Sequence, residues 1–143
     1  MKQLPISKVE LLERRVASVE ELEAGLRTLR VGEADAYLSA TDAMVISQAA
    51  LVVDIVNAKK LPTMFSDLDS VVKGGLASYG VSYDTMGRLT AKYVKSILLG
   101  VNPGDLPVEQ VDRLYFVVNL KTVKALGLTI PPSLLQRADE VIQ

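Results

Sequence analysis

Short apolar runs alternate with amphipathic stretches along this chain. Residues 8–16 are rich in Val and Leu and predict a first strand. Ser18, with Glu21 three residues later, has the spacing of a capping box, and apolar side chains then recur at helical spacing over residues 19–29. This part of the sequence therefore predicts a strand followed by an amphipathic helix.

The same alternation continues through the middle of the chain. Residues 36–40 form a short apolar run that predicts a second strand. Residues 43–58 are apolar on almost every side, which is typical of a helix that is buried over most of its surface. Pro62 then opens a third predicted strand over residues 63–65.

Polar residues and glycines mark the next two elements. Ser66, with Asp69 three residues later, predicts the N-cap of a short helix. This helix is expected to end at residues 74–75, where two glycines stand. Residues 76–81 then predict the fourth strand.

A long helix and several short elements are predicted in the second half. The helix spans residues 84–99, with Gly100 placed as its C-cap. Residues 106–110 and 114–118 predict two further strands, and Asn119 is the expected N-cap of a short helix. The apolar stripe of the long helix consists of Met86, Leu89, Tyr93 and Ile97.

The order of these elements predicts the fold class. Residues 139–142 form a last expected strand, so strands and helices alternate along the whole chain. This alternation is typical of an α/β fold with a mostly parallel sheet flanked by helices. With 143 residues, 49% of them hydrophobic, the chain has the size of one domain and enough apolar side chains for its core.

Composition narrows the classes of partner and cofactor. The 16 basic and 17 acidic residues show no basic stripe and only 5% of residues are aromatic, so nucleic acid is not an expected partner. The chain has no Cys and no His, which removes thiol nucleophiles, imidazole bases and the commonest zinc ligands. It also lacks a calcium-binding Asp-x-Asp-x-Asp-Gly loop, so neither a metal nor another cofactor is expected.

No targeting or membrane-spanning segment is predicted in this chain. Residues 1–5 contain no apolar core of the kind that a signal peptide requires. The most apolar run, residues 43–56, is too short to cross a bilayer and is interrupted by Gln48 and Asp54.

Polar residues gather where the predicted strands end. In open parallel sheets, ligands bind beyond the carboxyl ends of the strands, where helix N-termini present free N–H groups. Three pairs of residues, each beside a different predicted strand, are therefore expected at one edge of the sheet. The candidate ligand-binding residues are Thr41, Asp42, Ser66, Asp67, Ser78 and Tyr79.

Each candidate also has a purely structural interpretation. Thr41 or Asp42 could cap the following helix, and Ser66 is the expected cap of the next one, which would leave Asp67 freer for a ligand. Tyr79 could belong to the core. Asp42 and Asp67 also suggest a pair of acid/base carboxylates or a receiver-like phospho-acceptor site. Neither a phosphate-binding glycine loop nor a G-x-S-x-G motif is present, so we do not predict an enzyme.

The second half carries a distinctive series of segments. Gly-Leu-Ala-Ser-Tyr-Gly at 75–80 precedes the long helix, and Pro-Gly-Asp-Leu-Pro-Val-Glu-Gln follows it at 103–110. The series continues with Val-Asn-Leu-Lys-Thr at 118–122, Lys-Ala-Leu-Gly-Leu-Thr-Ile-Pro-Pro-Ser-Leu-Leu at 124–135 and Arg-Ala-Asp-Glu-Val-Ile at 137–142. These segments resemble the carboxyl-terminal part of the ABC-transporter substrate-binding family that includes tryptophan- and tyrosine-binding lipoproteins.

The resemblance implies a two-lobed periplasmic-binding-protein fold of type I, about twice as long as this chain. Residues 1–143 would form its carboxyl-terminal lobe. Residues 76–110 would include the hinge crossings, and the helix at 84–99 would belong to the missing lobe. The implied function is the extracytoplasmic, membrane-anchored solute-binding component of an ABC importer, which captures an amino acid or related solute and delivers it to a permease. A ligand-sensing regulatory domain of the same fold is the alternative.

The resemblance also implies how the site would work. In amino-acid-binding relatives, a carboxylate and a hydroxyl meet the ammonium and carboxylate of the ligand. Thr41 and Asp42 match that strand-end position best, whereas Asp67 and Tyr79 match it less closely. Ala43 stands where relatives can carry a polar amide, so the resemblance implies that recognition differs at this position.

The apolar stripe of the long helix needs a partner. If the helix at 84–99 normally covers the missing lobe, we expect it to fold back onto this lobe or to pair with a second copy in a homodimer. The alternative is that it is an ordinary core helix of this lobe.

Overall fold

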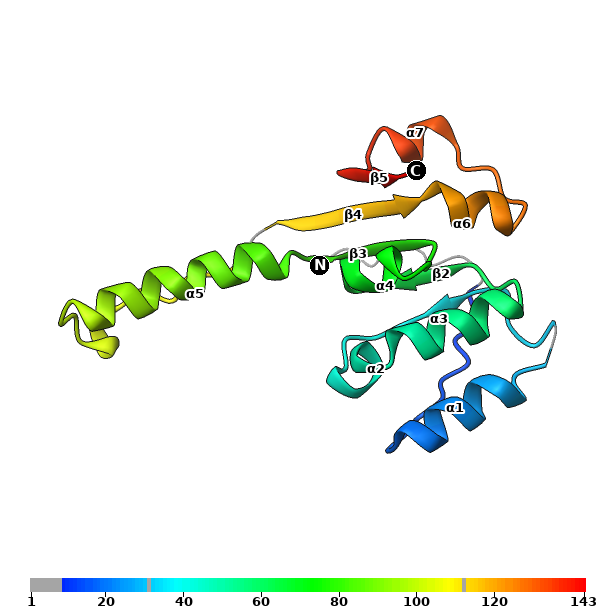
Figure 1. The fold of residues 1–143 in the computed structure, drawn as a ribbon, viewed down its shortest axis with the longest axis horizontal. Coiled ribbons are helices and arrows are strands. Elements are labelled where there is room, and N and C mark those ends of the chain that lie inside the picture. Colours follow the sequence, from blue (N-terminus) through cyan, green and yellow to red (C-terminus); the bar gives the residue numbers. More distant parts are fainter. Residues whose placement is uncertain (1–8, 31, 112) are drawn as a thin grey trace.

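A computed structural model describes residues 9–30, 32–111 and 113–143 as one sheet with helices on both faces (Figure 1). The strand order is β1-β2-β3-β4-β5, in which only the β3–β4 pair is antiparallel. The predicted α/β fold with a mostly parallel sheet is confirmed. The strands are β1 (Tyr37–Leu38), β2 (Thr63–Phe65), β3 (Ala77–Val81), β4 (Leu114–Asn119) and β5 (Glu140–Ile142).

Side-chain caps begin most of the helices. Ser18 accepts a hydrogen bond from the backbone N–H of Glu21, and Asn119 accepts from those of Lys121 and Thr122, as the sequence predicts. None of the helices in the described ranges is long and apolar enough to cross a membrane. The helices are α1 (Val19–Thr28), α2 (Ala43–Ser47), α3 (Ala49–Ala58), α4 (Leu68–Val72), α5 (Tyr83–Leu98), the 3-10 turn η1 (Pro103–Asp105), α6 (Leu120–Ala125) and α7 (Pro132–Leu135).

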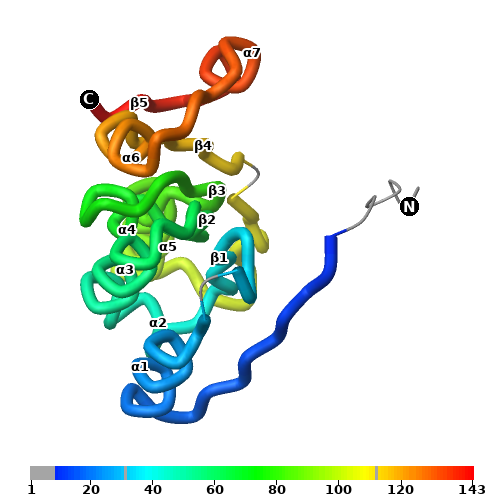
Figure 2. The backbone as a smooth tube through the Cα atoms, turned by 90° about the vertical axis from the view of Figure 1, so that its right-hand side faces the viewer, coloured from blue at the N-terminus to red at the C-terminus, as the bar shows by residue number. Residues whose placement is uncertain are grey.

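Two hydrophobic clusters cover the two faces of the sheet. Neighbouring residues of β2 point to opposite faces, so Phe65 packs against α1 and α3 while Met64 packs toward α6 and α7. The first cluster is centred on Val52 and Val56 of α3, which are 0% exposed. In Figure 2 the strands lie one above the other, with α6 and α7 near β5 and α1 near the opposite end. The sheet is therefore covered on both sides, as expected for parallel strands.

The strand predicted at residues 8–16 is wrong. Residues 9–16 form no strand in the described part of the chain, and Figure 2 shows this segment running apart from the sheet. Val9 and Leu11 are both 74% exposed. The Val and Leu content is typical of a strand, but no neighbouring strand pairs with the segment among the described residues. Residue 8, and residues 1–5 on which the signal-peptide prediction rests, lie outside the described residues.

The strand predicted at residues 106–110 is also wrong. After η1 this segment returns toward the sheet without strand pairing and lies along α5. The Tyr93 hydroxyl donates to the Pro107 carbonyl and accepts from the Glu109 backbone N–H. The ring of Pro107 removes one backbone donor, and the side chain of Tyr93 takes the place of a strand partner.

Two helix predictions change in detail. The helix predicted over residues 43–58 is broken at Gln48, whose φ of -100° and ψ of 20° separate α2 from α3. The long helix predicted at 84–99 is present as α5, and Gly100 at its end has a φ of 93°. Helix α5 does not fold back onto the sheet. It projects away from the sheet edge (Figure 1), and none of its residues is buried.

Candidate ligand-binding site

The carboxyl ends of β1, β2 and β3 lie side by side at one edge of the sheet. The backbone N–H of Ser39 donates to the Met64 carbonyl at 3.0 Å and continues the β1–β2 pairing beyond the strand. Phe65 of β2 is paired with Ser78 of β3, so the next residue of β2, Ser66, lies beside Tyr79. The three segments predicted to converge therefore follow, or lie in, adjoining strands.

Gly80 allows β3 to approach Ser66 closely. A Cβ atom added at Gly80 would lie 1.9 Å from the Ser66 carbonyl oxygen, a distance at which no side chain fits. Sequence reasoning placed Gly80 in a strand without giving it this role. A glycine inside a strand pattern often marks a close backbone approach, so the signal was present in the sequence.

Ser66 and Asp67 have exchanged the roles that the sequence predicts. Asp67, not Ser66, is the N-cap of α4, because its Oδ1 accepts from the Ser70 backbone N–H at 2.8 Å. The Ser70 hydroxyl also donates to the Asp67 carboxylate, which is buried. Ser66 Oγ, in contrast, is buried and has no hydrogen-bond partner among the described residues. A buried side-chain oxygen without a partner is uncommon in proteins, so Ser66 stands out among the residues at this edge.

Thr41 and Asp42 lie at the same edge, after β1, and both are exposed. Asp42 caps α2, since its Oδ1 accepts from the Val45 backbone N–H at 3.1 Å. A carboxylate accepts at both oxygens, so this cap leaves capacity for a second donor. The helix-capping interpretation of Asp42 is confirmed, and it does not occupy the whole carboxylate.

The two residues of β3 face different surroundings. Ser78 is 2% exposed and lies inside the sheet next to Val117 of β4. Tyr79 is 56% exposed, and its ring meets the edge of Phe116 at a centroid distance of 6.5 Å. The core interpretation of Tyr79 is therefore wrong. The exposed ring forms a flat apolar surface beside Ser66, of a kind that suits another planar group.

Ser39, which the sequence assigns to a strand, is a further polar residue at this edge. It is 7% exposed and its hydroxyl lies near Tyr37. Burial raises the pKa of the Tyr37 hydroxyl, and the hydrogen bond with Ser39 partly offsets this shift, so the phenol stays neutral near pH 7. The edge is thus built from hydroxyls, one exposed carboxylate and an exposed aromatic ring. The described residues contain no group of three or more side chains suited to hold a metal ion.

A family model described as ABC transporter substrate binding protein matches residues 2–142. The chain belongs to this family. The family resemblance drawn from the segments in the second half is therefore confirmed.

Three relatives illustrate what this member of the substrate-binding family is similar to. A tyrosine-binding protein of Clostridioides difficile (strain R20291) is 29% identical over 119 residues, which are 83% of this chain. The crystal structure of a conserved domain protein from Vibrio cholerae is 28% identical over 93% of this chain, with a TM-score of 0.83. An ABC domain from Streptococcus pneumoniae, solved in complex with L-Trp, is 31% identical over 89% of this chain, with a TM-score of 0.80.

These relatives are longer than the chain described here. The chain spans 34% of the length of the tyrosine-binding protein, and 45% and 44% of the lengths of the two solved chains. This member of the substrate-binding family forms one α/β unit. Its candidate site lies at the carboxyl ends of β1, β2 and β3.

Proposed function

We propose that this chain is one lobe of an extracytoplasmic solute-binding protein that captures an aromatic amino acid for an ABC importer. The observation that supports this most strongly is the family match over residues 2–142, together with relatives named for binding tyrosine and L-Trp. The site edge agrees in chemistry, because it combines an unpaired hydroxyl, a carboxylate and an exposed ring.

The proposed ligand contacts follow from the charges of an amino acid. The carboxylate of Asp42 would accept from the ligand ammonium, and Ser66 Oγ would donate to the ligand carboxylate. The ring of Tyr79 would pack against an aromatic side chain, for which stacked or edge-to-face contacts are favourable. Thr41, which is exposed next to Asp42, would supply a further hydroxyl. Asp67 and Ser78 would support the site from within, since both are buried.

The proposed mechanism is capture between two lobes by hinge closure. The chain spans less than half of each solved relative, so a second lobe would supply the opposite wall of the cleft and exclude water. Residues 76–110, which include β3, α5 and the segment at 106–110 that lies along α5, would contain two of the hinge crossings. The closed complex would then be the form that meets an ABC permease outside the cytoplasm.

Thermal unfolding of this chain with added amino acids tests the proposal. L-Trp or L-Tyr should raise the melting temperature by mass action, since each would bind the folded state only. L-Lys, which lacks an aromatic group, should have a smaller effect. Ser66→Ala should weaken binding roughly tenfold, the effect of losing one hydrogen bond to a charged group. Ser133→Ala, an exposed serine in α7, is the matched control. If no amino acid shifts the transition up to its solubility limit, this lobe does not bind an aromatic amino acid without the second lobe.

A further inference from the structure

The exposed ring of Tyr79 has an aromatic partner on the next strand. Tyr79 of β3 is paired with Phe116 of β4, and the two rings meet at 70° with their centroids 6.5 Å apart. Phe116 is half-buried and packs against the hydrophobic cluster that includes Val123 of α6. Edge-to-face contact is favourable, and the more buried ring limits the positions of the exposed one. The orientation of Tyr79 therefore depends on where Phe116 is held.

The backbone of Phe116 faces away from Tyr79. In an antiparallel pair, a strand bonds to the facing strand at every second residue. The Asn119 backbone N–H bonds toward β3, to the Leu76 carbonyl at 2.9 Å. Three residues before Asn119, the backbone groups of Phe116 therefore point the other way, toward β5. Tyr79 and Phe116 form a non-hydrogen-bonded pair, in which the side chains approach closely and make the contact.

Both backbone groups of Phe116 bond to Asp139. The Asp139 backbone N–H donates to the Phe116 carbonyl at 2.8 Å, and Asp139 Oδ2 accepts from the Phe116 N–H at 2.9 Å. Arg113 donates to the other carboxylate oxygen of Asp139, and its guanidinium lies 4.9 Å from the centre of the Tyr115 ring. Asp139 is therefore held by Arg113 on one side and holds Phe116 on the other.

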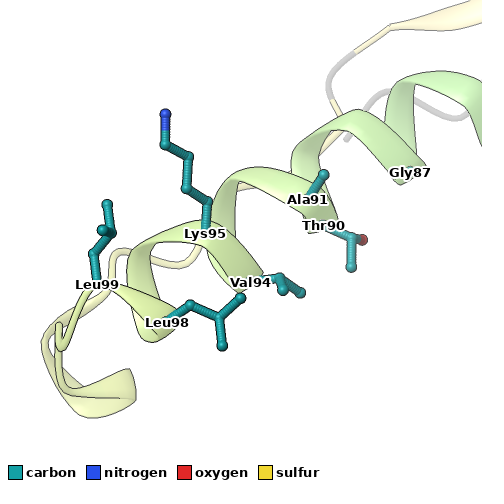
Figure 3. Close-up of a pocket in the computed structure, with 7 residues that line it drawn as sticks. All are labelled: Gly87, Thr90, Ala91, Val94, Lys95, Leu98 and Leu99. Atoms are coloured by element: carbon teal, nitrogen blue, oxygen red, sulfur yellow. The ribbon is translucent and has the colours of Figure 1, made fainter.

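A second apolar surface, along α5, is less suited to an amino acid. It is a shallow groove on the helix, lined by residues between 87 and 99 (Figure 3). None of these lining residues is Asp or Glu, so the groove offers no carboxylate to the ammonium of a ligand. The sheet edge that carries the ring of Tyr79 also carries the exposed carboxylate of Asp42. The aromatic pair at this edge is therefore the surface that we connect with ligand binding.

We propose that Asp139 is a positioning residue of the candidate site, which holds Phe116 and through it the ring of Tyr79 against an aromatic ligand. The ligand part of this proposal rests on the proposed function. Asp139→Ala removes the acceptor of the Phe116 N–H, whereas Asp139→Asn keeps an oxygen that accepts it. The alanine variant should weaken L-Trp binding about three- to tenfold, the contribution of an aromatic contact, and the asparagine variant should restore most of it.

A double-mutant cycle separates positioning from a general loss of structure. If Asp139 acts through the ring of Tyr79, Asp139→Ala should not weaken L-Trp binding further in a Tyr79→Ala background. The chain contains no Trp, so the fluorescence anisotropy of added L-Trp measures its binding directly. Asp84→Ala is the matched control, because it also removes a carboxylate that pairs with an arginine, Arg88. This control should leave L-Trp binding unchanged.

The ring of Tyr79 gives a second readout that needs no ligand. Its proton resonances are displaced by the neighbouring Phe116 ring, and Tyr79→Phe identifies them in the ¹H spectrum. They should move toward those of free tyrosine in Asp139→Ala and stay in place in Asp139→Asn. If they do so but the natural chain binds no L-Trp, binding by this lobe alone fails while the positioning of Tyr79 stands. Identical Tyr79 resonances in all three proteins would overturn the proposal, as would an equal loss of affinity with and without the Tyr79 ring.

Discussion

At the end of β2, two adjacent polar residues have different surroundings. Asp67 is 2% exposed and its carboxylate holds the Ser70 backbone N–H and hydroxyl, so it fixes the start of α4. Ser66 Oγ has no partner among the described residues, and Ser66 follows the β2 residue that pairs with Ser78, the neighbour of Tyr79 in β3. Asp67 therefore fixes the start of α4, and Ser66 is the residue that we propose contacts the ligand.

Replacing each of the two capping aspartates should show that the buried cap contributes more stability than the exposed cap. Asp67→Ala removes a buried cap and leaves the Ser70 hydroxyl without its acceptor, so the free energy of unfolding should fall by about 2–4 kcal/mol. Asp42→Ala removes an exposed cap and should cost about 1 kcal/mol. Urea denaturation of both variants measures the difference. Equal losses would contradict the buried role of Asp67.

Gly80 should tolerate no side chain. Gly80→Ala would force its Cβ toward the Ser66 carbonyl oxygen, which is 1.9 Å away, so β2 and β3 would have to separate. Overpacking of this kind typically lowers the free energy of unfolding by about 1–3 kcal/mol, and a backbone contact lies at the upper end. Gly25→Ala in α1 is the matched control, because nothing lies within 4 Å and alanine favours a helix by about 0.5–1 kcal/mol. A neutral Gly80→Ala would refute the close approach.

The sequence predicts which residues lie at this edge of the sheet more accurately than it predicts the role of each residue. Strand ends and the following polar residues locate Thr41, Asp42 and Tyr79 correctly at the edge. Ser66 and Asp67 are both good caps, and each has a polar residue three positions later. Only the register of α4 against the sheet decides which of them points inward, and that register depends on contacts distant in the sequence.

At the scale of the elements, Asp139 joins the start of β5 to β4 at one end of the sheet. Its backbone N–H donates to the Phe116 carbonyl, and its Oδ2 accepts from the Phe116 backbone N–H at 2.9 Å. Arg113 donates to the other carboxylate oxygen. The Phe116 hydrogen bond, followed by Arg113, lowers the pKa of Asp139 below its ordinary value.

This lowered pKa makes part of the stability depend on pH. The folded state binds a proton at Asp139 less readily than the unfolded state, whose carboxyl titrates near pH 3.9. The stabilising contribution is therefore present above about pH 4 and is lost as pH falls through the folded pKa. Between about pH 5 and pH 3, the urea midpoint should fall less for Asp139→Asn than for the natural chain. Parallel pH profiles of the two proteins would contradict this role.

The strands and helices themselves follow from the sequence where local signals and packing agree. Residues 63–65 and 76–81, and the helix caps at Ser18 and Asn119, are predicted because each apolar run is bounded by turn or cap residues. Residues 9–16 and 106–110 have strand-like composition, but no strand pairs with them in the part of the chain that the structure describes. The break at Gln48 is not predicted, because no Gly or Pro stands there in the sequence.

At the scale of the whole molecule, the length of the relatives bears on the candidate site. The relatives are more than twice as long, and a ligand held at the ends of β1, β2 and β3 would face the remainder of such a protein. The same comparison favours a transport receptor over a ligand-sensing regulatory domain, since the matched family is described by ABC transport. The projecting α5 would then lie against the remainder of such a protein rather than on its own sheet.

The most direct test of this account is a map of ligand-induced amide shifts in the ¹H–¹⁵N spectrum of this chain, titrated with L-Trp. Such shifts detect weak binding, which is expected if one wall of the cleft is missing. The account predicts that saturable changes cluster at residues 39–42, 66–67 and 78–80 and need roughly tenfold more L-Trp in Ser66→Ala. Saturable changes confined to other elements, such as the surface between α1 and α3, would contradict the site. No change at any amide would contradict binding by this chain.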